Sequence, residues 1–197
     1  MKVILLSLIC LLLVPSQNPA QSWRTYSPPD NSFSIELPAP MRRVTWFEGK
    51  HGAEIEPDPD VDKDVISYAA IQSEPKAREY GVVVINGKSK EISSKGRGDR
   101  VDGLWFLIGG DDATPTSERS VRVNGFIGRE YVYAKEISDE RYARGRIVDT
   151  GENIYVIVFV AQAAEDLTSS DAERFLNSFH PQRSKVKRGR NYSKRRA

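Results

Sequence analysis

Ile154-Tyr155-Val156-Ile157-Val158-Phe159-Val160 decides the fold, because every residue in this stretch is apolar. A strand with one face in water alternates polar and apolar residues, so a strand that is apolar on both faces is predicted at the centre of a sheet. Ser170-Asp171-Ala172-Glu173 follows, with the capping-box pattern that opens a helix. The apolar residues of that helix have i, i+3, i+4, i+7 spacing and predict one stripe packed on the sheet: Ala172, Phe175, Leu176 and Phe179.

The residues before this stretch predict further antiparallel strands. Asn124-Gly125 lies between predicted strands at residues 120–123 and 126–134, and it is typical of a type I′ hairpin turn because both positions tolerate positive φ. A strand at residues 142–148 joins the central strand, residues 154–161, through a loop at 149–152. Earlier strands are expected at residues 33–37, 43–47, 65–71 and 80–85. Residues 93–108 carry apolar residues at helical spacing, so we expect a short helix there that Gly109-Gly110 ends.

The order of these elements resembles exported bacterial proteins with the PsbP-like fold. The resemblance rests on an aromatic lead-in before Phe33-Ser34-Ile35-Glu36-Leu37-Pro38, on the Asn124-Gly125 hairpin, and on the closing helix at residues 171–179. It implies an α+β fold class, with helices packed on an antiparallel sheet in an α/β/α sandwich, and a non-catalytic accessory or binding role. It assigns no functional residue, because no functional residue of the family has a match in this chain.

Residues 1–21 have the pattern of a secretory signal peptide. Lys2 precedes an apolar run at residues 3–14, which is shorter than the roughly twenty apolar residues of a membrane-spanning helix, and Ala20 offers a cleavage point. We therefore expect a signal peptide (1–21), an α+β domain (22–180) and a tail (181–197). Localisation is expected to be secreted or periplasmic, with no transmembrane segment after signal removal; an uncleaved anchor is the alternative. Cys10, the one cysteine, lies in the signal, so the mature chain has no thiol nucleophile and no redox pair.

The formal net charge of +2 hides an uneven distribution. Once Lys2 leaves with the signal, the body keeps 20 of the 29 cations against all 27 acids, a formal charge of −7 beside a tail of +8. Such a tail cannot bury enough apolar area to fold, so we expect disorder from residue 181 onward. Its cations are the predicted polyanion-binding residues: Arg183, Lys185, Lys187, Arg188, Arg190, Lys194, Arg195 and Arg196.

An anionic envelope surface or an acidic protein is the expected partner of the tail, and export argues against nucleic acid. Two alternatives are a solubilising extension without a partner and a tail that folds back on its own acidic body.

A run of carboxylates at every second position, residues 54–64, is the candidate metal site. Calcium prefers such oxygen ligands, and the candidate ligands are Asp58, Asp60, Asp62 and Asp64. However, Lys63 and Ala69 stand where an EF-hand loop starting at Asp58 requires glycine and glutamate, and a solvated acidic loop is the competing interpretation. No other cofactor is predicted.

Other motifs favour structural roles. Gly109-Gly110-Asp111-Asp112 is similar to metal-binding aspartate turns, but no phosphate-cradling glycine loop accompanies it, so a turn after a helix is favoured. The chain has two histidines, His51 and His180, but no G-x-S-x-G motif that would supply the serine of a serine hydrolase. Five aromatic residues are candidates for a ligand groove or, as core and cross-strand pairs, for packing: Trp105, Phe106, Tyr131, Tyr133 and Tyr142.

The sequence thus favours an exported, non-catalytic binding or accessory protein of the cell envelope whose basic tail attaches to polyanionic surfaces. A metal-assisted hydrolase that uses the acidic loop, and a domain of purely structural role, are the alternatives.

Overall fold

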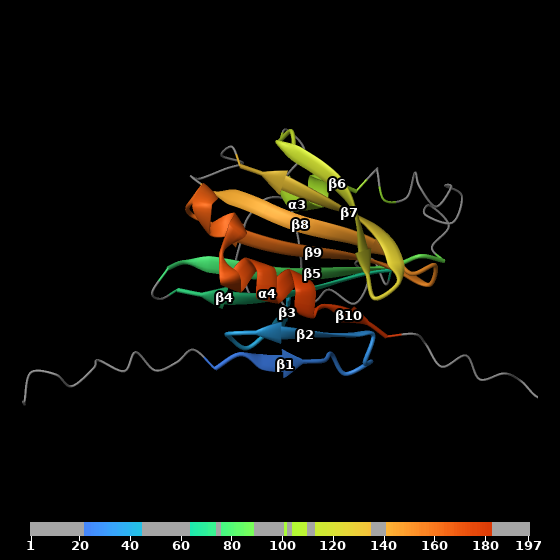
Figure 1. The fold of residues 1–197 in the computed structure, drawn as a ribbon. Helices are drawn as coiled ribbons and strands as arrows, with labels where there is room; N and C mark the ends of the chain where they lie inside the picture. The colour runs from blue at the N-terminus through green and yellow to red at the C-terminus, as the bar shows by residue number, and fades with distance from the viewer. Residues whose placement is uncertain are drawn as a thin grey trace, which may run out of the picture.

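A computed structural model of the chain describes residues 22–44, 64–73, 76–88, 101, 104–109, 113–134 and 141–182. Within these residues a seven-stranded sheet has the order β3-β4-β5-β9-β8-β7-β6, and every pairing that links its strands is antiparallel (Figure 1). Its strands are β3 (Arg42–Val44), β4 (Val65–Gln72), β5 (Arg78–Asn86), β6 (Ser117–Val123), β7 (Phe126–Tyr133), β8 (Tyr142–Asp149) and β9 (Asn153–Ala161). A smaller sheet contains β1 (Arg24–Tyr26), β2 (Phe33–Leu37) and β10 (His180–Pro181).

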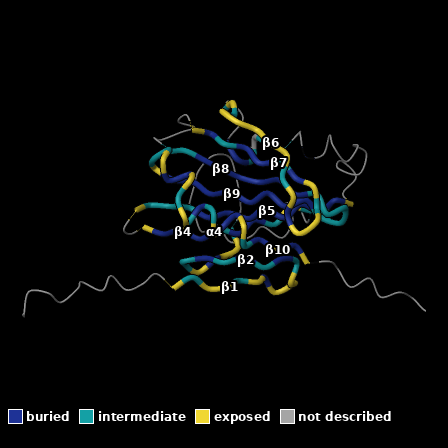
Figure 2. The backbone as a smooth tube through the Cα atoms, viewed as in Figure 1, coloured by how far each residue is buried: buried dark blue, intermediate teal, exposed yellow. Residues whose placement is uncertain are grey.

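The apolar stretch at residues 154–160 occupies the middle of the large sheet. It lies in β9, which pairs with β5 on one side and β8 on the other, and all seven residues are buried. Figure 2 shows the same distribution, with burial concentrated in β5, β8 and β9 and exposure in β1 and β6. The prediction of a central strand is confirmed, because only a strand covered on both faces can bury such a run.

One face of the large sheet packs against α4 (Ser170–Ser178) and the small sheet. Aromatic rings carry this contact: the ring centroids of Tyr80 and Phe175 lie 5.1 Å apart, and those of Tyr155 and Phe179 lie 5.2 Å apart. The predicted stripe of Ala172, Phe175, Leu176 and Phe179 is fully buried here, as its spacing predicted.

The opposite face packs against α3 (Phe106–Gly109) and the residues just before it. Ile108 lies among Ile147, Val156 and Val158 in this second core. A short 3₁₀ helix, η2 (Ala164–Thr168), leads into α4. Helices are few and short in the part of the chain that the structure describes, so the architecture is an antiparallel sheet that dominates an α+β fold. A full α/β/α layering stays a prediction.

The helix predicted over residues 93–108 falls largely outside the described residues. Of its C-terminal part, Val101 and residues 104–108 are described; α3 ends at Gly109, the first of the two glycines predicted to end it, and Gly110 lies outside the described residues. The glycine is required there because a Cβ atom would lie 2.3 Å from Cε1 of Tyr133. Close packing of a helix on a strand therefore explains Gly109.

Two local predictions about turns and caps have different outcomes. Asn124 (φ 51°) and Gly125 (φ 87°) form the predicted hairpin turn between β6 and β7. At α4 the predicted capping box is displaced by one residue: Ser169 is the N-cap, and its hydroxyl accepts a hydrogen bond from Ala172 N at 3.3 Å. The predicted cap, Ser170, is the first helical residue, and the Glu173 carboxylate accepts a hydrogen bond from Arg144 across the fold.

The folded part extends past the predicted domain boundary at residue 180. Pro181 is buried and pairs with Phe33 in β10, and Gln182 N donates a hydrogen bond to Ser32 O at 2.9 Å. The strand predicted at residues 43–47 is described only as β3, which ends at Val44. The predicted signal peptide, most of the acidic loop and the tail from Arg183 lie outside the described residues.

Candidate functional site

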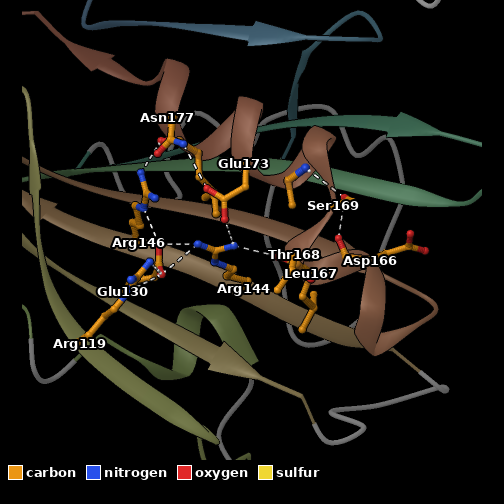
Figure 3. Close-up of polar contacts among 12 residues, drawn as sticks. Arg119, Glu130, Arg144, Arg146, Asp166, Leu167, Thr168, Ser169, Glu173 and Asn177 are labelled. Atoms are coloured by element: carbon orange, nitrogen blue, oxygen red, sulfur yellow. Dashed lines mark hydrogen bonds and ion pairs between the residues drawn. The ribbon is translucent and has the colours of Figure 1, made fainter.

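A cluster of charged side chains is buried between the large sheet and α4. Glu130 on β7 is 2% exposed, while Arg144 and Arg146 on β8 are 4% and 8% exposed. Glu173 approaches from α4 and Arg119 from β6, and these side chains point toward one another (Figure 3). Charges this deep are rarely tolerated unless each has a partner, so the cluster is the first place to look for a function.

Glu130 is the centre of the cluster. Its Oε2 accepts hydrogen bonds from Arg146 Nε at 2.7 Å and from Arg144 Nη2 at 3.2 Å. Its Oε1 accepts from Arg119 Nε at 2.8 Å and from Arg144 Nη2 at 3.1 Å. Three guanidinium groups therefore surround one carboxylate, and both of its oxygens are engaged.

The two buried arginines also reach the backbone around α4. Arg144 Nη1 donates to Leu167 O at 3.0 Å and to Glu173 Oε1 at 2.6 Å. Arg146 Nη1 donates to Leu176 O at 2.8 Å. Leu176 lies in the last turn of α4, where carbonyl groups lack a helical partner and the helix dipole favours positive charge. The cluster therefore joins both ends of the η2–α4 segment to β8.

The environment fixes the ionisation of the acidic members. Burial alone would raise the pKa of Glu130, but hydrogen bonds from Arg146 and Arg119 and the charge of Arg144 outweigh it and hold this pKa below its ordinary value. The hydrogen bond from Arg144 likewise lowers the pKa of Glu173. Both groups are thus carboxylates at neutral pH, and Glu130 is neither a proton donor nor a free base.

A second ion-pair group holds η2 and the start of α4 to β5. Asp166 Oδ1 lies 3.0 Å from Lys76 Nζ and 3.2 Å from Arg78 Nη2, and Arg78 also pairs with Asp171. Burial would raise the pKa of Asp166, but the hydrogen bond and charge of Lys76, with the charge of Arg78, lower it overall. Beside this group burial raises the pKa of Tyr80 to about 12, and its hydroxyl lies 3.1 Å from Gln72 Oε1.

Both groups of ion pairs hold the η2–α4 segment against the large sheet. The charged atoms bond to one another or to backbone carbonyls; among the described side chains of the first cluster, Arg144 Nε is the buried nitrogen without a partner. Neither group combines a nucleophile with a base. The arrangement is therefore suited to positioning α4 and not to acid–base chemistry.

Comparison with known proteins bears on the fold. No protein-family model and no curated protein matches the chain. Among solved structures it is similar to the solution structure of cyanobacterial PsbP (CyanoP) from Synechocystis sp. PCC 6803, with a TM-score of 0.51 and 12% identity, over 87% of this chain and 99% of that chain.

This chain has the PsbP-like fold. The resemblance seen in the sequence is thereby confirmed at the level of the fold, and at 12% identity it is the fold alone that the likeness shows.

One of the four candidate calcium ligands, Asp64, lies among the described residues of the PsbP-like domain. Asp64 Oδ1 accepts a hydrogen bond from Asn86 Nδ2 at 2.7 Å, and Asp64 O accepts from Asn86 N at 2.7 Å. Asp64 therefore closes the end of the β4–β5 pair. Asp58, Asp60 and Asp62 lie outside the described residues, and within the described ranges no three acidic, histidine or cysteine side chains gather as metal ligands.

Among the remaining candidate residues, the structure describes His180. His180 is exposed in β10, with Nδ1 2.6 Å from Ser178 O, whereas His51, Asp111, Asp112 and the eight tail cations lie outside the described residues. No helix among the described residues is both long and apolar enough to cross a bilayer.

The aromatic candidates divide between the two faces of the PsbP-like sheet. Trp105, Tyr131 and Tyr133 belong to the core under α3, where the Tyr133 hydroxyl donates to Trp105 O at 3.0 Å. Tyr142 packs into the core on the α4 face. Trp105 and Tyr131, with Pro115 and Glu118, line an open depression of about 330 Å³. Because Tyr142 lies on the opposite face, the four aromatic side chains that are described do not form one groove, and the side chain of Phe106 lies outside the described residues.

The buried Glu130 cluster was missed by sequence reasoning. The signal that indicates it is the spacing of Arg144 and Arg146, which alternate with small or apolar residues in a strand next to the central one. In a strand near the centre of a sheet both faces are covered, so two arginines on one face require buried partners.

Proposed function

We propose that this chain is an exported, non-catalytic accessory protein that acts by binding, and that its basic tail attaches it to a polyanionic surface of the cell envelope. The PsbP-like domain would form the rigid body, with helices layered on its sheet, and residues 1–21 would direct export. The PsbP-like fold supports the proposal, because the resemblance described above implies an accessory or binding role. The fold alone does not fix an activity.

The observation that carries the proposal is how differently the two parts of the chain use their charges. In the folded body the buried cations are engaged internally: Arg144 and Arg146 bond to Glu130 and to carbonyl groups of η2 and α4. The tail from Arg183 carries eight cations and no acid within its own length, so its charge has no partner nearby in the sequence. An anionic surface is the ligand that such a segment recognises without a preformed site.

The expected strength follows from the number of cations. Each Lys or Arg near an anionic leaflet contributes about 1 kcal/mol, and the attraction falls off within about one Debye length, roughly 10 Å at 0.1 M salt. Eight cations in one short segment therefore suffice for reversible attachment. The same argument predicts that binding weakens steeply as salt is raised.

The test is co-sedimentation with lipid vesicles of defined composition. The mature chain would be compared on vesicles of phosphatidylcholine alone and of phosphatidylcholine mixed with phosphatidylglycerol. We expect binding to the anionic vesicles only. Truncation should fall after Gln182 and not after His180, because Pro181 is buried in β10 and its removal would disturb the small sheet.

A full-length variant is the matched control for truncation. In it the eight tail cations are replaced by glutamine, which keeps the length and polarity of the tail and removes its charge. Both this variant and the chain that ends at Gln182 should lose vesicle binding while their thermal unfolding stays that of the mature chain. Binding by either variant as strong as that of the mature chain would place the contact on the folded body and contradict the proposal.

A further inference from the structure

The outer edge of β6 is a strand edge to which no described element pairs. β6 ends the seven-stranded sheet and bonds to β7 alone among the described strands (Figure 1). Ser117 to Ser120 and Arg122 are exposed, and Figure 2 shows this strand as one of the most exposed parts of the sheet. An edge of this length presents unpaired N–H and C=O groups that can pair with another strand.

The hairpin geometry identifies which backbone groups point outward. The two-residue turn at Asn124-Gly125 makes Val123 and Phe126 the closing hydrogen-bonded pair. Hydrogen-bonded pairs then alternate along an antiparallel ladder, so Arg119 and Val121 also bond toward β7. The N–H and C=O groups of Glu118, Ser120 and Arg122 therefore face away from the sheet.

These three outward-facing residues form a self-complementary sequence. We propose that β6 pairs with β6 of a second copy of this chain, antiparallel and centred on Ser120. In that register Ser120 faces Ser120 of the second copy, and Glu118 faces Arg122 of the second copy, twice by symmetry. In this register Glu118, Ser120 and Arg122, whose backbone groups face outward, meet the second copy in hydrogen-bonded pairs. Backbone pairing and charge pairing therefore select the same register.

Side-chain positions around β6 support the same register. Glu118 and Arg122 lie on the sheet face that also carries Arg129, with which Glu118 pairs, so Glu118 would lie between two guanidinium groups in the dimer. Arg119 lies on the other face and bonds to Glu130, which leaves it outside the pairing of Glu118 with Arg122. Opposite charges directly across an antiparallel pair stabilise it, and like charges destabilise it.

The strand at the other end of the sheet lacks this property. β3 is three residues long, and antiparallel pairing of two copies centred on Arg43 would place Arg43 against itself. The charge pattern therefore selects β6. The paired edges would join two sheets into one continuous sheet with a twofold axis at Ser120, and this small contact predicts a weak dimer.

Sedimentation velocity on the mature chain over roughly 10 to 500 µM protein would detect a weak dimer held by a contact of this small area. We expect the average mass to rise toward that of two chains. Ser120→Pro removes the central outward N–H and places a ring on the edge, which a monomer tolerates at a solvent-facing edge position. This variant should unfold like the parent and stay monomeric throughout.

A charge-swap pair tests the register independently of that variant. Glu118→Arg alone places arginine against Arg122 of the second copy, and Arg122→Glu alone places glutamate against Glu118. Each single variant should dimerise at least about tenfold more weakly than the parent. An equimolar mixture of the two restores an opposite pair at both sites, so it should dimerise like the parent.

Three results would overturn the proposal. One is a mature chain that stays monomeric over the whole concentration range. Another is a Ser120→Pro variant that is folded and still dimerises. The third is a mixture of the two charge variants that associates no better than either variant alone, because that result excludes the pairing of Glu118 with Arg122.

Discussion

Glu130 accepts hydrogen bonds from Arg119, Arg144 and Arg146, although only 2% of its surface is exposed. Glu130→Gln keeps the shape of the side chain and leaves two buried guanidinium groups without their central counter-charge. We expect the free energy of unfolding to fall by about 3 kcal/mol, measured by urea denaturation at neutral pH. Arg119→Gln is the control: its side chain is 62% exposed, so its loss should cost less than about 1 kcal/mol. Equal effects of the two variants would contradict the central place of Glu130.

Titration of the same carboxylates predicts how stability depends on pH. The pKa values of Glu130 and Glu173 lie below their ordinary 4.5, and that of Asp166 lies below its ordinary 3.8. A group whose pKa is lowered by folding contributes its full stability above the ordinary value and loses it as pH falls through the lowered one. Unfolding free energy should therefore be level from neutral pH down to about 5 and fall steadily below that. Glu130→Gln should flatten this fall, and a profile unchanged by the variant would contradict the assignment.

Residues of this cluster show where a sequence pattern is compatible with two interpretations. Arg144 and Arg146 alternate with Ala143, Gly145 and Ile147, which is also the pattern of a strand with one wet face. Only the position of α4, fixed by contacts distant in the sequence, makes that face a buried one. The outward direction of Glu118, Ser120 and Arg122 is different, because the Asn124-Gly125 turn determines it locally.

The N-cap of α4 lies one residue before the predicted one. Ser169→Ala removes the hydroxyl that accepts from Ala172 N and should lower the free energy of unfolding by about 1 kcal/mol. Ser170→Ala is the matched control, since Ser170 is exposed in the first turn and should change little. Thermal and urea unfolding of both variants would measure this. A larger loss in Ser170→Ala would support the cap that the sequence pattern favours.

Signals that lie close together in the sequence explain why most elements were predictable. The apolar stretch in β9, the stripe on α4 and the Asn124-Gly125 turn each depend on residues close in sequence, and the structure confirms all three. The cap of α4 was misplaced because Ser169 and Ser170 are equally good capping residues, and the contact between Glu173 and Arg144 that separates them is not local. β10 was missed for a similar reason, because a two-residue strand exists only through its pairing with β2.

At the scale of the whole molecule, charge divides the chain without its predicted signal peptide into a body of −7 and a tail of +8. The division and the candidate binding residues of the tail follow from composition alone, and they remain predictions because the tail lies outside the described residues. The candidate calcium ligands Asp58, Asp60 and Asp62 also lie outside the described residues, so the calcium site remains a prediction. A dimer through β6 would carry two tails and so strengthen attachment to one surface by avidity.

Attachment through the tail requires that the folded body be stable without the tail, so that the tail is free to bind a surface. The most direct measurement is the free energy of unfolding of the chain ending at Gln182 beside that of the mature chain, by urea denaturation at low salt. We predict values equal within about 0.5 kcal/mol, the size expected for changes away from the packed structure. A loss of about 1 kcal/mol or more on truncation, abolished by added salt, would show the tail bound to its own acidic body and contradict attachment through a free tail.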